Sequence, residues 1–173
     1  MCFAFATNLT MNYIYFQVAQ QLEWSTMGKV MANVQVQPYL FFAGRCEEAI
    51  KFYVEALGAE LQMLMRFSES PEPMPEAMLP DGFDDKIMHA SLKVGDSVVM
   101  MSDAVDIQNQ FGGVSLSINC MNKEDAHKMF DGLSVDGEVQ MPLTPTFWSP
   151  LFGSLTDKFG VSWMVNCEPA ENS

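Results

Sequence analysis

The stretch 43–58, AGRCEEAIKFYVEALG, has the clearest secondary-structure pattern in the chain. Its apolar residues recur at intervals of three and four positions, which is typical of the buried stripe of an amphipathic helix. Gly58 follows the last of them and fits the C-cap of that helix. We therefore expect a helix here, packed on a sheet through this stripe. The stripe consists of Cys46, Ala49, Ile50, Tyr53, Val54 and Leu57.

Strand-like segments flank the expected helix on both sides. After the helix, an alternation of period two predicts a strand with Leu61, Met63, Met65 and Phe67 on one face. Of these, we expect Met63 and Met65 in the core. The next two segments read as a hairpin that turns at Gly95 and Asp96. The predicted order is one strand, one helix and three strands. The strand segments are VQPYLFF (36–42), AELQMLMRF (59–67), IMHASLKVG (87–95) and SVVMMSD (97–103).

The same order recurs in the second half of the chain. Asn122 fits the N-cap of a second helix, whose apolar stripe repeats that of the first at an offset of 77 residues, from Ala49 to Ala126. A duplicated βαβββ unit, an α+β fold with repeats at about 34–105 and 112–168, accounts for this offset. The strands of the second unit come from VSLSINC (114–120), EVQMPL (138–143), the linking stretch FWSPLFGSLTD (147–157) and VSWMVNC (161–167).

Composition narrows the class of protein. Of the 173 residues, 49% are hydrophobic and 18% charged, which is typical of a folded domain. The net charge of −13 repels phosphate backbones and anionic lipids, so we expect neither nucleic-acid nor membrane binding. No apolar run reaches the roughly 18 residues of a membrane-spanning helix. The four cysteines are scattered without a metal-binding spacing, which favours reduced thiols in a cytoplasmic protein.

Three segments lie outside the regular pattern. Residues 1–33 are apolar and aromatic, and three interpretations stay open: a poorly ordered extension, an upstream start codon, or a segment packed on a partner subunit. Residues 169–173 form a short tail. Within 68–86, four prolines and six acidic residues predict a loop, either a lid over a site or a solvated acidic surface.

Four motifs give the chain a family resemblance: PYLFF, CEEAIKFYVEALGAEL, KIMHASLKVGDSVVMMSD and MPLTPTFWSPLFGSLTDKFGVSWMVNC. Together they resemble the PhnB-like branch of the vicinal-oxygen-chelate superfamily, which includes glyoxalase I, ring-cleaving dioxygenases, and fosfomycin and bleomycin resistance proteins. The resemblance covers residues 34–168. It implies two modules whose sheets form one curled mixed sheet around a pocket. Because such sheets expose edges and apolar faces, we also expect a homodimer.

The resemblance also implies where a metal ion would be held. In the metal enzymes of this superfamily, ligands come from the first and last strand of each module. The corresponding positions here are Pro38, Met100, Ser115 and Met164. Divalent metals need carboxylate or imidazole ligands, and this set offers one hydroxyl. We therefore predict no metal ion and no cofactor, with a displaced metal site as the alternative.

Other side chains are candidates for lining the pocket. His89 is expected on the strand face away from the helix, either bonded within the sheet or in contact with a ligand, whereas His127 is expected in solvent. Trp148 could form an aromatic wall or a dimer anchor, and Arg66 could pair with a ligand anion or with the acidic loop. The predicted ligand-binding residues are His89, Ser115, Ser117, Asn119, Trp148, Met100, Met164 and Arg66.

The function expected from these features is binding of a small organic molecule in a metal-free pocket, by a protein of unassigned activity. One alternative is an enzyme of the glyoxalase and dioxygenase superfamily that uses His89, with Asp103 nearby, or a displaced metal. A methyltransferase label attached to the family is a further alternative. No strand followed by a glycine-rich turn supports a dinucleotide-like cofactor fold, so we do not favour it.

Overall fold

The computed structural model describes residues 34–72, 79–104 and 111–168. The chain divides into two compact units, 1–36 and 37–173, and the second holds every described helix and strand. The predictions for residues 1–33 and 169–173 fall outside the described residues, as does part of the proposed lid. No helix of the described part is long and apolar enough to cross a membrane.

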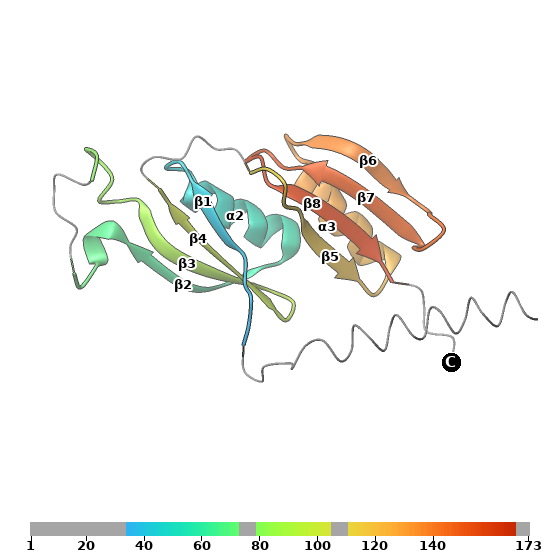
Figure 1. The fold of residues 1–173 in the computed structure, drawn as a ribbon, viewed down its shortest axis with the longest axis horizontal. Helices are drawn as coiled ribbons and strands as arrows, with labels where there is room; N and C mark the ends of the chain where they lie inside the picture. Colours follow the sequence, from blue (N-terminus) through green and yellow to red (C-terminus); the bar gives the residue numbers. More distant parts are fainter. Residues whose placement is uncertain (1–33, 73–78, 105–110, 169–173) are drawn as a thin grey trace, which may run out of the picture. The chain divides into compact units, whose positions relative to one another are not determined.

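The second unit contains the two predicted βαβββ modules (Figure 1). Each module has one four-stranded mixed sheet in which the first strand runs parallel to the last. The described strands form two four-stranded sheets, one in each module, which confirms the expected α+β fold of paired βαβββ modules. The first sheet has the order β1-β4-β3-β2 and the second β5-β8-β7-β6. The first module comprises β1 (Tyr39–Phe42), α2 (Cys46–Leu57), β2 (Glu60–Arg66), β3 (Ile87–Val94) and β4 (Ser97–Asp103). The second comprises β5 (Leu116–Cys120), α3 (Lys123–Ser134), β6 (Glu138–Thr144), β7 (Leu151–Thr156) and β8 (Ser162–Cys167).

The end of α2 and the start of α3 lie where the sequence predicts them. Gly58 caps the C-terminus of α2 with a left-handed φ of 63°, a conformation that glycine adopts without steric cost. The Asn122 side chain accepts a hydrogen bond of 2.9 Å from the backbone N–H of Asp125 and so caps the N-terminus of α3. Local sequence therefore determines these helix ends.

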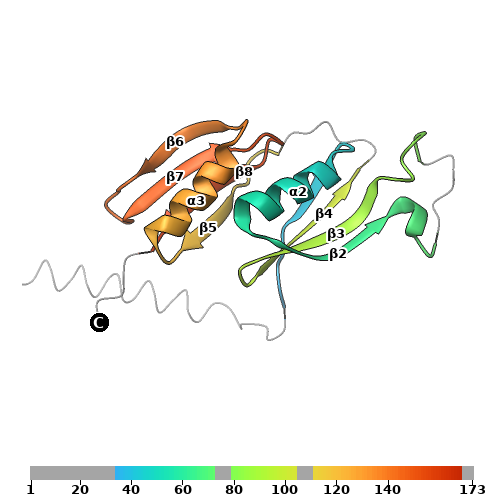
Figure 2. The ribbon, with the colours of Figure 1, turned by 180° about the vertical axis from the view of Figure 1, so that it is seen from behind.

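The two helices lie on the same side of the sheets and pack against each other (Figure 2). Gly132 of α3 allows this contact, because a Cβ at this position would lie 3.0 Å from Cα of Ala56 on α2. The packing also changes which side of α2 is buried. Val54, predicted in the core, is exposed, whereas Phe52 is buried with its ring 5.6 Å from that of Phe159 in the second module.

A buried carboxylate joins the two modules. Asp157, within the TDKFG motif, accepts hydrogen bonds from the Tyr53 hydroxyl of α2 (2.7 Å) and from Nε1 of Trp163 on β8 (2.8 Å). The backbone N–H groups of Phe159 and Val161 donate to its other oxygen. Four donors offset the cost of burying the charge, so the most specific motif of the sequence has a structural role here.

Candidate functional site

Each sheet has one face covered by its helix and one face that points away from the helix, which we call the open face. In the first sheet, Leu40, Ala90 and Met101 are buried against the helix. Their neighbours along the strands therefore lie on the open face, since side chains alternate along a strand. Cross-strand pairing places one row of these residues side by side: Tyr39, Met100, Ser91 and Met63.

Met63 was predicted in the core, but its side chain is 41% exposed. A register shift between Leu61 and Met63 places Met63 opposite Ser91 on the open face, whereas Leu61 pairs with Leu92. Leu61 is also exposed, at 43%, because β2 is an edge strand of the sheet. Side chains no longer alternate strictly between the two faces of the sheet across such a register shift. One extra residue moves the side chains that follow it to the opposite face.

The polar centre of the open face is a pair formed by His89 and Tyr39. The Tyr39 hydroxyl lies 2.9 Å from Nδ1 of His89, and the two rings are 5.6 Å apart. Tyr39 also stacks on Phe41, with ring centroids 4.9 Å apart. Because Nδ1 is occupied by the phenol, Nε2 is the ring nitrogen that can meet a ligand. Sequence reasoning missed Tyr39 and Phe41, although their alternation with the buried Leu40 and Phe42 is a signal that could have found them.

The open face of the second sheet is more polar. Ser117 pairs with Met164, and Asn119 pairs with Asn166, whose Nδ2 donates a hydrogen bond of 3.1 Å to Oδ1 of Asn119. Ser115 lies just before β5, which begins at Leu116, and is exposed like Ser117 and Asn119. Of the three predicted polar residues, Ser117 and Asn119 lie within the strand.

Trp148 lies in the irregular segment between β6 and β7. Its ring packs edge-to-face on Phe147 at 4.5 Å and on Phe152 of β7 at 5.6 Å. Phe147 is 96% exposed, so this aromatic group is not part of the core. The buried Ser149 hydroxyl next to Trp148 is hydrogen-bonded to the backbone carbonyls of Leu151 and Cys167. These contacts hold the segment in place.

Two cavities flank the first strands of the modules. The larger, of about 470 Å³, lies between β5 and the β3–β4 turn, and has Asp96, Ser97, Ser117 and Asn119 as its polar lining. The second, of about 370 Å³, lies between β1 and the segments 111–116 and 161–162. Both volumes are in the range of small-molecule pockets. Neither cavity is lined by His89, Met100, Trp148 or Arg66.

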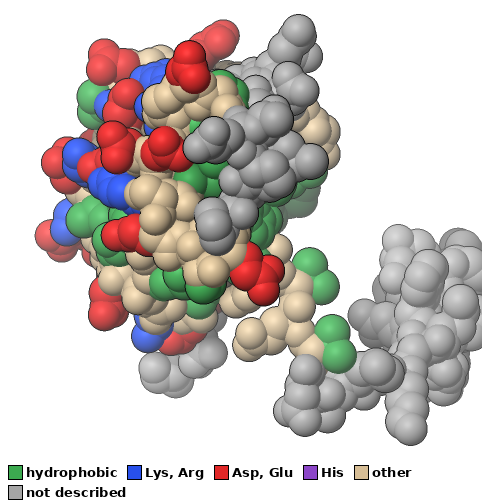
Figure 3. Space-filling view, turned by 90° about the vertical axis from the view of Figure 1, so that its left-hand side faces the viewer, with side chains coloured by type: hydrophobic (Ala, Val, Ile, Leu, Met, Phe, Trp, Pro, Cys, Tyr) green, Lys and Arg blue, Asp and Glu red, His purple; other side chains and the backbone are tan. Residues whose placement is uncertain are grey.

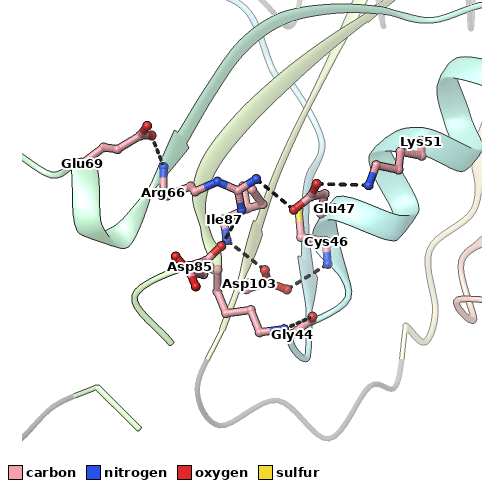
Figure 4. A network of polar contacts seen from close by, with 10 residues as sticks. Gly44, Cys46, Glu47, Lys51, Arg66, Glu69, Asp85, Ile87 and Asp103 are labelled. Atoms are coloured by element: carbon pink, nitrogen blue, oxygen red, sulfur yellow. Dashed lines mark hydrogen bonds and ion pairs between the residues drawn. The ribbon is translucent and has the colours of Figure 1, made fainter. Parts of the chain in front are cut away.

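Arg66 lies in a different network, at the N-terminal end of α2 (Figure 4). Its guanidinium forms an ion pair of 3.0 Å with Glu47 and donates to the carbonyl of Asp85. Hydrogen bonds from Lys51 and then from Arg66 lower the pKa of Glu47. Arg66 therefore pairs with the helix and the end of the acidic loop, away from His89, and we remove it from the candidate site.

Asp103 belongs to the same network. Its carboxylate accepts hydrogen bonds from the backbone N–H of Cys46 at 2.9 Å and of Ile87 at 3.0 Å. These bonds tie the start of α2 to the start of β3, as Figure 4 shows. Asp103 is thus satisfied within the fold, so we do not place it with His89 as a catalytic group.

The positions derived for metal ligands do not form a metal site. Pro38 and Ser115 precede their strands, and the residues paired with Met100 and Met164 are Tyr39 and Ser117. The described residues contain no group of three or more His, Cys, Asp or Glu side chains placed to hold a metal. The donors do not fit the divalent ion of the superfamily's metal enzymes.

Acidic side chains are spread over the surface at the β2 end of the first module, with basic and hydrophobic ones between them (Figure 3). His127 on α3 is exposed, as predicted. The open face of the first sheet differs from this surface, because its central side chains are aromatic, thioether, hydroxyl and imidazole groups.

Comparison with known proteins places this geometry in a family. The model of the family described as 3-demethylubiquinone-9 3-methyltransferase matches residues 34–166. Protein YjdN of Escherichia coli is 38% identical over 137 residues, which are 76% of this chain and 93% of YjdN. The structure of PA1353 from Pseudomonas aeruginosa is 44% identical, with a TM-score of 0.69, covering 79% of this chain and 98% of that one.

Two further structures relate the fold to a wider superfamily. The putative 3-demethylubiquinone-9 3-methyltransferase, PhnB protein, from Bacillus cereus is 28% identical, with a TM-score of 0.63, covering 78% of this chain and 99% of that one. The fosfomycin resistance protein FosX from Listeria monocytogenes has a TM-score of 0.56 at 9% identity, covering 82% of this chain and 98% of that one. The likeness to FosX concerns the fold alone.

Proposed function

Because the chain belongs to the PhnB-like branch of the vicinal-oxygen-chelate superfamily, we propose that it binds a small, partly apolar organic molecule without a metal ion. The binding surface is the open face of the first sheet. The observation that carries this proposal is the hydrogen-bonded pair of Tyr39 and His89, set among apolar side chains that remain partly exposed.

The chemistry of this face defines the class of ligand. Phe41, 43% exposed and stacked on Tyr39, offers a flat apolar surface for an aromatic or conjugated group. Met63 and Met100 offer flexible thioethers that adapt to irregular shapes. Nε2 of His89 can hydrogen-bond one polar end of the molecule. A planar organic molecule with a single polar end fits this combination.

A catalytic role for His89 is the second candidate function. The hydrogen bond between His89 and Tyr39 orients the imidazole ring, as a supporting residue orients a general acid or base. The methyltransferase name of the family model is no argument for that reaction here, since the sequence has no strand followed by the glycine-rich turn of a dinucleotide-like cofactor fold.

We also propose that the chain forms a homodimer. Supporting this, β1 and β5 each have one hydrogen-bonded neighbour among the described strands, which leaves an edge open on each sheet. Phe147 and Trp148 expose apolar surface on the second module that a second copy would cover.

The test uses 1-anilinonaphthalene-8-sulfonate, which has a flat naphthalene ring and one polar end and whose fluorescence rises on binding. Replacing His89 with Ala should weaken binding about fivefold, since one hydrogen bond is worth about 1 kcal/mol. Phe41→Ala should weaken it further through lost stacking. His127→Ala is the matched control and should leave binding unchanged.

Two results would overturn the proposal. One is equal affinity of the His89→Ala and His127→Ala proteins. The other is a loss of binding on replacing Asn119 with Leu while His89→Ala has no effect, because the molecule would then occupy the cavity beside β5 and not the open face.

A further inference from the structure

Three sulfur atoms gather under α3 in the second module. Cys120 of β5 and Cys167 of β8 are direct partners in a parallel ladder, so both side chains leave the sheet on the same side. They are only 4% and 2% exposed. Met129 of α3 reaches the first of them, with its Sδ 3.9 Å from Sγ of Cys120.

We propose that Cys120, Cys167 and Met129 form a binding site for one soft monovalent cation, Cu(I). Thiolate and thioether sulfur are the ligands that Cu(I) prefers, whereas hard divalent ions need oxygen ligands. A set of three sulfur donors favours Cu(I) over Zn²⁺, which takes four ligands in structural sites. This site is independent of the ligand-binding face proposed above.

The spacing of the sulfurs suits one shared ion. With metal–sulfur bonds of about 2.3 Å, the sulfurs of a planar three-coordinate site lie about 4.0 Å apart. The distance between Cys120 and Met129 is 3.9 Å. Partner residues on neighbouring strands are about 4.8 Å apart, so a side-chain rotation can bring Cys167 to the same ion.

The ion has a path to the site. Met129 is half-buried and lines the 470 Å³ cavity beside β5, so its thioether would be the first ligand that an entering ion meets. The Cys167 thiol, which now lies 3.6 Å from the carbonyl of Glu168, would turn toward the ion. Binding releases one proton from each thiol and leaves two thiolates and one Cu(I), with a net charge of −1.

The site is tested by anaerobic titration with Cu(I) against bathocuproine disulfonate, with stoichiometry from native mass spectrometry. All proteins carry Cys2→Ser, because Cys2 lies outside the described residues. We expect one equivalent of Cu(I), bound on the order of a hundredfold more weakly after Cys120→Ser or Cys167→Ser. Met129→Leu removes only the sulfur, keeps the side-chain volume and should cost about tenfold.

Matched controls separate this cluster from sulfur in general. Cys46→Ser removes a buried thiol of the first module, and Met141→Leu removes a half-buried thioether of β6. Neither should change the affinity. Equal losses in Cys46→Ser and Cys120→Ser, or no loss in either cysteine variant of the cluster, would overturn the site. If circular dichroism shows that the cysteine variants are unfolded, the Met129→Leu variant tests the site instead. An unchanged affinity of that variant for Cu(I) refutes the three-sulfur site.

Discussion

Replacing Tyr53 with Phe tests the contact that joins the two modules. The change removes the hydroxyl that donates to Asp157 at 2.7 Å and keeps the buried ring, which packs on Trp163 at 5.6 Å. Asp157 keeps its other three donors, so the loss is that of a single hydrogen bond to a charged group. Such a bond contributes about 1.5–3 kcal/mol, so we expect the free energy of unfolding to fall by about 2 kcal/mol.

Urea unfolding followed by tryptophan fluorescence at a fixed protein concentration measures this loss. The midpoint of thermal unfolding should fall by roughly 4–8 °C, since 1 kcal/mol corresponds to about 2–4 °C in a domain of this size. Tyr39→Phe is the matched control, because it removes an exposed hydroxyl bonded to His89, and it should cost less than about 0.5 kcal/mol. Equal losses in the two variants would refute the role assigned to Asp157.

The remaining predictions concern pH, metal ions, association and thiols. Burial, followed by the Asp157 carboxylate, raises the pKa of Tyr53 far above its usual value. The Tyr53 hydroxyl therefore stays protonated in the folded chain, whereas in the unfolded chain it ionises above about pH 10. Its contribution is therefore complete well below pH 10 and falls as pH rises further. In urea titrations, the stability difference between wild type and Tyr53→Phe should shrink as pH rises above about 10. Calorimetric titration with Zn²⁺, Ni²⁺, Mn²⁺ or Fe²⁺ should show binding no tighter than to surface carboxylates, and one tight equivalent lost in His89→Ala would contradict the metal-free pocket. Light scattering should give twice the chain mass of 19.4 kDa. Association should tighten as the salt concentration rises from about 0.1 M to about 1 M, because salt screens the charge of −13 on each chain. The mass of a monomer at both salt concentrations would exclude the dimer. Burial raises the pKa of both Cys46 and Cys120, so each should react with dithionitrobenzoate in the folded protein far more slowly than in urea at the same pH.

The sequence by itself determined the features that depend on neighbouring residues. The apolar stripe of α2, its cap at Gly58 and the cap of α3 at Asn122 follow from helix geometry and short-range hydrogen bonds. The duplicated order of strands and helices followed from periodicity, and the family from its motifs. The exposure of His127 also followed, since its position lies off the apolar stripe of α3.

Tertiary structure decided the features that depend on residues far apart in the chain. His89 meets Tyr39 across 50 residues and Tyr53 meets Asp157 across 104, so neither contact leaves a local pattern in the sequence. Contact with Phe159 buries Phe52 while Val54 is left exposed, although the helix period allows both in the core. The register shift in β2 turns Met63 to the open face, because strand pairing and not the alternation of residues sets which side chains face the helix.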